Sequence, residues 1–184
     1  MLRILTKYLD RGAEGLARFC AAQNGATAVE FALIAPAFLA MIFAILQLTI
    51  FLFAQQTLQN AAVQTGRLFM TGSAQTSGLT QTQFINNNVC PIVSALFTCS
   101  NLQVNVAAYS SFSSANTSAP TLYNSQGQLQ TTGTYSTGSP GTIMVVQLAY
   151  AWPIIGLPIG SLLSSTGYGT TEMMGVAAFR VEPY

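Results

Sequence analysis

The chain has 184 residues, of which 6% are charged, 51% are apolar and none is histidine, with a formal net charge of +1. About a quarter of the residues of a soluble globular protein are charged, so this composition indicates one ordinary domain plus a membrane anchor. The net charge is close to zero, and no basic stripe occurs beyond residue 18. Both features argue against a nucleic-acid partner. Without histidine, triads, Cys-His nucleophiles and histidine metal ligands are excluded, and we expect neither an enzyme nor a cofactor or metal site.

The first 25 residues form a basic segment that we interpret as a cytoplasmic leader. Four of the six basic side chains precede the long apolar run: Arg3, Lys7, Arg11 and Arg18. The other two, Arg67 and Arg180, follow it. An excess of Lys and Arg on one flank of a span places that flank in the cytoplasm. We therefore predict that the C-terminal body faces the periplasm or the outside of the cell.

Residues 26–54 are predicted to form a transmembrane helix. From Phe31 to Ala54, 24 residues pass without a charge. At about 1.5 Å per residue they extend roughly 36 Å, which exceeds a hydrocarbon core of about 30 Å. Pro36 is expected to kink or loosen this helix rather than prevent it. The alternatives are a buried core helix and a cleavable secretory signal, whose apolar region is usually about 7–15 residues.

One carboxylate, Glu30, lies five residues after Gly25 and directly before Phe31. A carboxylate inside a membrane helix costs roughly 2.5–3.5 kcal/mol near the bilayer centre and less toward the edge. Its presence at the border of the span suggests a function that involves a partner. The alternative is a glutamate that only snorkels to the membrane edge.

Residues 55–72 are predicted to continue the same helix outside the bilayer. Side chains with apolar character recur there at steps of three and four residues: Leu58, Ala61, Ala62, Thr65, Leu68 and Phe69. Gly66 is a weak point, and Gly72 with Ser73 is a plausible stop. A continuous helix over about residues 28–71 would be about 66 Å long and would act as a stalk for an outer domain.

Residues 73–184 are predicted to form a small extracytoplasmic domain of α+β class, with a helix packed on an antiparallel sheet of about three strands. Apolar spacing indicates a helix over Thr80–Phe97, broken or restarted at Pro91. Alternation over residues 102–108 predicts the first strand. The segments Ile143–Trp152 and Thr170–Arg180 are the second and third strand candidates. Residues 110–141, which are rich in Ser, Thr and Gly and carry no charge, are predicted to be a long loop or irregular hairpin.

Two of the three cysteines, Cys90 and Cys99, lie on the side assigned to the oxidising compartment. A disulfide between them would close a ten-residue loop and contribute about 2–3 kcal/mol in the chain-entropy model. The alternative is a pair of free buried thiols. Cys20 lies on the other side and is expected to be an ordinary thiol of the leader or of an interface.

Residues 153–160 are apolar, and residues 142–171 contain no charge. A second membrane span is the alternative, but the two prolines and four glycines of residues 142–171 make this segment a poor spanning helix. We expect a hydrophobic loop that packs on a partner or on the membrane surface. Asn116-Thr117-Ser118 matches the glycosylation triplet, a short pattern that also arises by chance.

The chain resembles the TadE-like proteins, minor pseudopilins of tight-adherence (Flp-type) pilus systems. The resemblance rests on residues 24–33 (NGATAVEFAL) and the long apolar helix that follows. It is supported by residues 64–67 (QTGR), the Cys90/Cys99 pair and the C-terminal segment 179–184 (FRVEPY).

This resemblance implies cleavage between Gly25 and Ala26 by a prepilin-type peptidase on the cytoplasmic face. The new α-amino group of Ala26 would then be positive near neutral pH and would meet Glu30 of a neighbouring subunit. The implied partners are the peptidase, the major Flp-type pilin and other pseudopilins, the inner-membrane assembly platform and membrane lipid. The implied location is the inner membrane, as a single-pass protein that can enter the pilus.

Two other classes of function were weighed against a minor pseudopilin. One is a membrane-anchored extracytoplasmic module that recognises a surface ligand through its Ser/Thr-rich loop. The other is an enzyme that uses Glu172, Tyr168 and Glu182 for acid-base chemistry, which no spacing supports.

Overall fold

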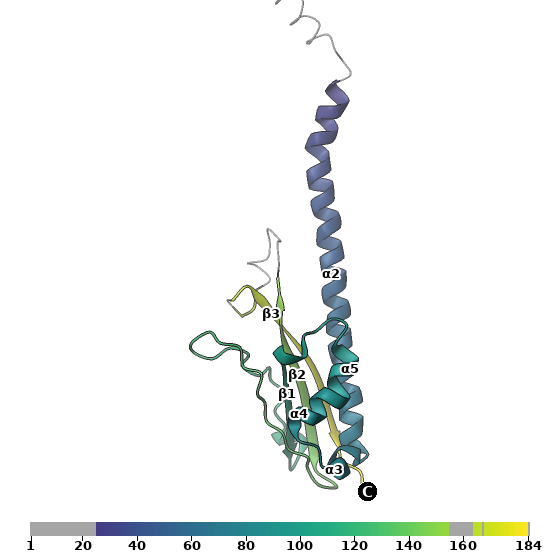
Figure 1. Cartoon of the computed structure of the whole chain (residues 1–184), viewed down its shortest axis with the longest axis vertical. Helices are drawn as coiled ribbons and strands as arrows, with labels where there is room; N and C mark the ends of the chain where they lie inside the picture. Colours follow the sequence, from purple (N-terminus) through teal and green to yellow (C-terminus); the bar gives the residue numbers. More distant parts are fainter. Residues whose placement is uncertain (1–24, 155–163, 167, 184) are drawn as a thin grey trace, which may run out of the picture. The chain divides into compact units, whose positions relative to one another are not determined.

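The computed structural model describes residues 25–154, 164–166 and 168–183 (Figure 1). The chain divides into two compact units, Met1–Leu48 and Thr49–Tyr184, which are described separately below. The basic leader up to residue 24, including Cys20, and residues 155–163 of the predicted hydrophobic loop lie outside the described residues.

Helix α2 spans Ala26–Met70 and crosses from the first unit into the second. In the first unit it contains Pro36, which does not interrupt it. Proline has no N–H to donate and its ring crowds the preceding turn, yet membrane helices tolerate it. The prediction of one continuous helix from the apolar run into the outer domain is therefore confirmed.

In the second unit, α2 is the core helix of the domain rather than a free stalk. One face of the helix is fully buried: Ala54, Leu58, Ala61, Ala62, Thr65 and Phe69. The opposite face, including Gln56, Asn60 and Arg67, is exposed. This division into two faces is that of a helix packed on a sheet. The helix is followed by Gly72, whose positive φ of 77° suits a residue without a side chain, as the predicted stop requires.

A short helical region follows, made of α3 (Ser73–Ser77), α4 (Gln81–Phe84), the π-helical turn η2 (Ile85–Val89) and α5 (Cys90–Val93). Thr80 and Gln83 form a capping box at the start of α4. Sequence spacing predicted a helix broken or restarted at Pro91, and α5 does start at Cys90 with Pro91 in its first turn. The Cys90 N–H bonds to the Ile85 carbonyl, so the wider π turn directly precedes Pro91, which has no N–H to donate.

The sheet contains β1 (Leu102–Tyr109), β2 (Ile143–Pro153) and β3 (Thr170–Arg180) in the order β1-β2-β3, with both pairings antiparallel. The α+β architecture with a three-stranded antiparallel sheet is thus confirmed. The register places Val104 opposite Leu148, and Leu148 opposite Gly175. Short 3-10 turns, η3 (Cys99–Asn101) and η4 (Phe112–Ser114), flank β1.

The core lies between one face of this sheet and the helices. It joins side chains of α2 with side chains from the short helices and from all three strands, among them Phe69, Phe84, Val104, Leu148 and Met173. A Cβ added at Gly175 would overlap the carbonyl oxygen of Leu58 and lie 3.0 Å from the Gln59 Cα. The backbones of β3 and α2 are therefore in direct contact at Gly175.

Helix α2 also covers the free edge of β3. The Gln59 side chain accepts from the Val176 N–H at 3.0 Å and donates to the Val176 carbonyl at 2.8 Å. Gln55 donates to the Met174 carbonyl at 2.8 Å. An uncovered edge strand is a template for aggregation, so these two glutamines take the place of a fourth strand along this part of β3.

The other face of the sheet is covered by the long connection between β1 and β2. Gln147, in the middle strand, donates to the carbonyls of Asn116 and Ser118 at 3.3 and 3.0 Å. Gln103 donates to the Thr132 carbonyl at 3.4 Å. Composition predicted a long loop or an irregular hairpin here, and the connection contains one isolated antiparallel bridge, between Tyr123 and Leu129. It is a third layer of the domain because the polar centre of the sheet bonds to its backbone.

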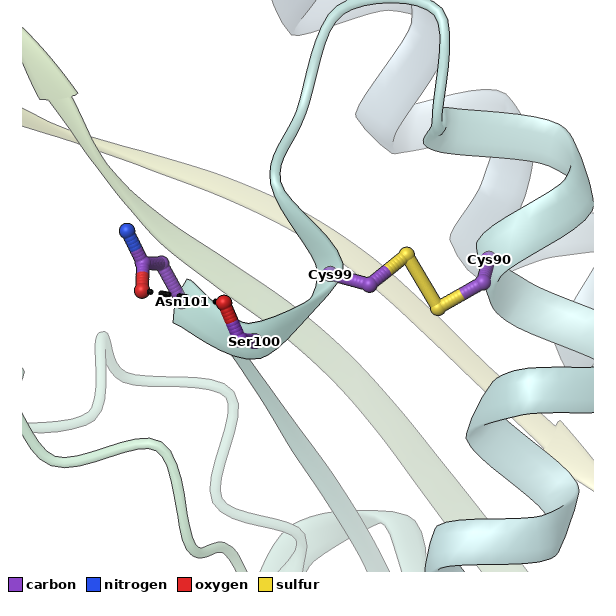
Figure 2. Close-up of a disulfide and its surroundings, with 4 residues drawn as sticks. All are labelled: Cys90, Cys99, Ser100 and Asn101. Atoms are coloured by element: carbon purple, nitrogen blue, oxygen red, sulfur yellow. Dashed lines mark hydrogen bonds between the residues drawn. A yellow bond between two sulfur atoms is a disulfide. The ribbon is translucent and has the colours of Figure 1, made fainter.

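Cys90 at the start of α5 and Cys99 at the start of η3 form a disulfide (Figure 2). Their Cα atoms are 5.8 Å apart, within the usual range for a disulfide. The bond ties the short helical region to the residues that lead directly into β1. Ser100 and Asn101, also drawn in Figure 2, complete this turn, with the Ser100 hydroxyl 3.4 Å from Asn101 Oδ1.

Candidate processing and membrane-anchoring site

The predicted processing site lies at the N-terminal end of α2. Gly25 is exposed and directly precedes Ala26, the first residue of the helix. A Cβ added at Gly25 would meet no atom within 4 Å. Packing therefore does not require glycine at this position.

Glu30 and Phe31 lie on exposed positions of the same helix, with Phe31 73% exposed. Glu30 is four residues after Ala26, so the two residues lie on the same side of the helix, about 6 Å apart along its axis. The structure thus places the carboxylate one turn from the predicted new N-terminus. A charged α-amino group exists at Ala26 only after a cut between Gly25 and Ala26.

The rest of α2 in the first unit presents large apolar side chains in every direction. Leu33, Ile34, Phe43 and Leu48 each expose more than half of their surface. A helix that is apolar on all sides needs an apolar surrounding. Among the described residues, this is one helix long and apolar enough to cross a bilayer, and little of its apolar stretch is buried by the protein itself. The helix fits a single-pass membrane anchor near the N-terminus.

The contact between the apolar run and the domain was not anticipated from the sequence. Ala54 belongs to the apolar run, yet it is fully buried within the second unit. Phe51 packs against the same core. The domain thus begins on the last turn of the apolar run. Helical periodicity alone carried no signal for this contact, because a helix apolar on all sides hides the face that a sheet will cover.

The residues considered for acid-base chemistry do not form one site. Glu172 lies near the start of β3, and Glu182 follows its end, where the Glu182 N–H bonds to the Met70 carbonyl. Ten residues of extended chain separate these glutamates by roughly 30 Å. Burial raises the pKa of Glu172. Tyr168 instead stacks on Tyr123, with ring centroids 4.5 Å apart.

Burial also raises the pKa of Tyr135, whose ring packs against Phe69 and Phe84 in the core. In the part of the chain that the structure describes, no three His, Cys, Asp or Glu side chains gather as a metal site would require. The ionisable side chains of the outer domain are therefore scattered over its elements.

These features fit a protein with a single-pass membrane anchor near its N-terminus, followed by a small α+β domain. The TadE-like protein family matches residues 25–67. The match begins at the glycine before α2 and covers the apolar helix and most of its packed continuation, less than a quarter of the chain. It confirms the resemblance that the N-terminal motif indicated, and it is consistent with a TadE-like protein of the tight-adherence pilus system.

No curated protein and no solved structure matches the chain. The family match therefore carries the functional assignment at a coarse level. It suggests a membrane protein associated with the tight-adherence pilus and involved with pilus components generally. This family is not known as enzymatic.

Proposed function

We propose that this protein is a minor pseudopilin that takes part in the assembly or export of an adhesive Flp-type pilus. The observation that carries the proposal is the coincidence of three features at one point. The TadE-like match begins at Gly25, α2 begins at Ala26, and the exposed carboxylate of Glu30 follows one turn later. The N-terminus faces the cytoplasm in this proposal, and the Thr49–Tyr184 unit faces the periplasm or the outside.

A prepilin-type peptidase cuts between Gly25 and Ala26 in this proposal. Gly25 is exposed, and the space around its Cα is open. Since the protein's own packing leaves this position unconstrained, a requirement for glycine there would come from the peptidase. The bond also lies at the N-terminal border of α2, which begins at Ala26.

Cleavage creates a charge that Glu30 can balance. The α-amino group of Ala26 is positive near neutral pH. Its own helix disfavours that charge, because the N-terminal end of a helix dipole is itself positive. A carboxylate at about 4 Å is worth roughly 4 kcal/mol of attraction at an intermediate dielectric, before desolvation. Pairing with Glu30 of a neighbouring pseudopilin or the major pilin would offset the cost of placing Glu30 at the membrane border and would set the register between helices.

Sequencing the N-terminus of the membrane-extracted protein tests the processing step. A start at Ala26 is expected, and an intact Met1 would contradict it. Gly25→Leu should abolish cleavage. The matched control is Ala28→Leu, an equally exposed position three residues into α2, which should still be cut.

Glu30→Gln tests the pairing step independently. The variant should be cleaved and inserted as before, but pilus number should fall, because the neutral amide no longer balances the new amine. Glu182→Gln removes an exposed carboxylate from the far end of the domain and serves as the control. Unchanged piliation in Glu30→Gln would remove the pairing role. Normal cleavage with a normal pilus count in every variant would favour an anchored adhesion module over a pseudopilin.

A further inference from the structure

The direction of the elements in the second unit identifies the end of the domain nearest the anchor. Helix α2 and β3 run the same way, because Gln55 contacts Met174 and the Glu182 N–H bonds to the Met70 carbonyl at 3.0 Å. The start of β3 therefore lies toward Thr49, where the chain passes from the anchor into the domain. β2 is antiparallel to β3, so its last residues lie at this end as well.

The side chains at this end are those typical of a membrane interface. We call Phe51, Trp152, Ile154 and Tyr168 the proximal surface. Trp152 is the single tryptophan of the chain; it is half-buried and packs edge-on against Phe97 with ring centroids 5.7 Å apart. Tyr168 is 54% exposed. Tryptophan and tyrosine concentrate at the headgroup level of membranes, where one side of the ring is apolar and the other is wet.

One backbone and one side-chain hydrogen bond hold the proximal surface together. The Ile154 N–H donates to the Gly169 carbonyl at 3.1 Å, which joins the end of β2 to the residue before β3. The Tyr123 hydroxyl lies 3.0 Å from Thr170 Oγ1 and keeps its ring against Tyr168. The surface is therefore a built feature of the fold.

Charge is distributed to match. Arg67, Arg180 and Glu182 lie at or near the end where α2 and β3 finish. Glu172 is the one charged residue of β3 near its beginning, and burial raises its pKa, so it ionises less readily than an exposed carboxyl. Residues 142–171, which directly precede Glu172, carry no charge. An approach to lipid headgroups at the proximal surface thus carries little desolvation cost.

The length of the anchor sets the distance to the bilayer. About 20 helical residues cross a hydrocarbon core, so a span that begins at Phe31 ends near Ile50. Ala54, four residues later, is already fully buried by the domain. At 1.5 Å per residue, Ala54 lies only about 6 Å beyond the hydrocarbon edge, and Phe51, which packs against the same core, lies closer still. This distance is within the headgroup layer.

We propose that the proximal surface rests in the headgroup layer of the outer leaflet of the bilayer that holds α2, so that Trp152 and Tyr168 are interfacial anchors for the domain. The occupant is lipid of the same membrane, because the surface is continuous with the membrane-spanning helix. The inference rests on the anchoring part of the proposed function. Contact between the proximal surface and the headgroups would hold the domain in a fixed position before assembly. Extraction of α2 into a fibre would have to break this contact.

The single tryptophan allows a direct test in the unaltered full-length chain. The protein is reconstituted in phosphatidylethanolamine/phosphatidylglycerol vesicles whose acyl chains carry bromine just below the headgroups. Because bromine quenches only nearby indoles, we expect a roughly twofold loss of Trp152 emission for a ring at headgroup level. Absence of bromolipid quenching overturns the proposal. If acrylamide also fails to quench Trp152, protein rather than lipid covers the proximal surface.

Two variants in a Trp152→Phe background separate the possible failures, with circular dichroism to verify folding. Phe43→Trp places the indole in the exposed apolar part of α2, and strong bromolipid quenching is expected. Phe112→Trp places it on an exposed site beyond the end of β1, at the opposite end of the domain, and no quenching is expected. If Phe43→Trp is quenched and native Trp152 is not, α2 spans the bilayer but the proximal surface does not contact the headgroups. If Phe43→Trp is not quenched, α2 does not span the bilayer, and both the membrane anchor and the headgroup contact are contradicted.

Discussion

The two parts of α2 are one helix in two different surroundings. Before Leu48 its large side chains, such as Phe31 and Leu33, are about three-quarters exposed. After Thr49 its inner face carries small or branched side chains, such as Ala61 and Leu58, that are completely buried. Hydropathy therefore identifies the helix but does not indicate what each part of the helix packs against. The first part needs lipid or other subunits, whereas the second part already has its partner in the sheet.

The small side chains of the second part decide how closely the sheet approaches. Alanines at positions 54, 61 and 62 leave room for strand backbone. In β3, Gly175 lacks a side chain and allows the strand to approach the backbone of α2. Gly66 of α2 is matched in turn by Phe179, whose ring would lie 2.8 Å from an added Cβ. Backbone-level contact of this kind has no counterpart in the first part of the helix.

The largest expected effect separates two leucines of the same helix. Leu58→Ala should destabilise the domain by about 2–5 kcal/mol, because a fully buried side chain leaves a cavity between α2 and the sheet. Leu46→Ala, at a position that is 52% exposed in the first unit, should leave the domain's urea midpoint unchanged. Equal losses in both variants would mean that the two parts of α2 share one surrounding.

A second pair compares two glycines. Gly175→Ala should cost about 1–3 kcal/mol, because the added methyl group meets the Leu58 carbonyl and forces β3 away from α2. Gly25→Ala adds the same methyl group in open space and should not change stability. Thermal unfolding of the two variants followed by circular dichroism measures the difference. A neutral Gly175→Ala would show that the close helix–strand contact contributes nothing.

The glutamine pairing with β3 is expected to have a smaller effect. Gln59→Leu removes two hydrogen bonds to Val176, each worth roughly 0.5–1.5 kcal/mol net, and uncovers the strand edge. Gln64→Leu changes an exposed position of the same helix and is the control. Hydrogen exchange at the Val176 amide should speed up in the first variant only. Unaltered exchange there would argue against the edge-covering role.

The smallest effect concerns pH. Because burial raises the pKa of Glu172, the folded state keeps this proton at a pH where the unfolded chain has lost it. Stability from this group is therefore complete below the ordinary carboxyl pKa and falls as pH rises through the raised value. Glu172→Gln should flatten this part of a melting-temperature profile between about pH 3 and pH 8. Glu182→Gln, at an exposed site, should retain the slope. A slope that persists in Glu172→Gln would assign it to another group.

Much of the fold follows from local patterns. Alternation in Leu102–Ala108 and the β-branched residues of Ile143–Trp152 predicted two strands to within about a residue of where they lie, and Thr170–Arg180 matches β3 at both ends. These strands obey local rules because each has one face on an apolar core. The helix expected to break or restart at Pro91 does restart there, because α5 begins at Cys90 after a π-helical turn and has the proline in its first turn.

Polar side chains of the sheet were harder to assign. Gln103 and Gln147 are buried in the sheet although both side chains are polar. Both donate to the backbone of the long connection between β1 and β2. Nothing in the Ser- and Thr-rich composition of that connection indicates that it forms a layer, because its hydrogen bonds use main-chain carbonyls that every residue carries.

By itself the sequence determined the anchor, the N-terminal motif from Gly25 to Phe31 and the order of the elements in the outer domain. Those features depend on hydropathy, charge and periodicity, which neighbouring residues in the chain define. Only the tertiary structure decided which face of α2 meets the sheet, that Gln59 closes the edge of β3, and that Ala54 and Trp152 lie at the anchor-proximal end of the domain. The physical reason is that these contacts join residues a hundred positions apart, whose meeting is set by packing and strand register rather than by any local pattern.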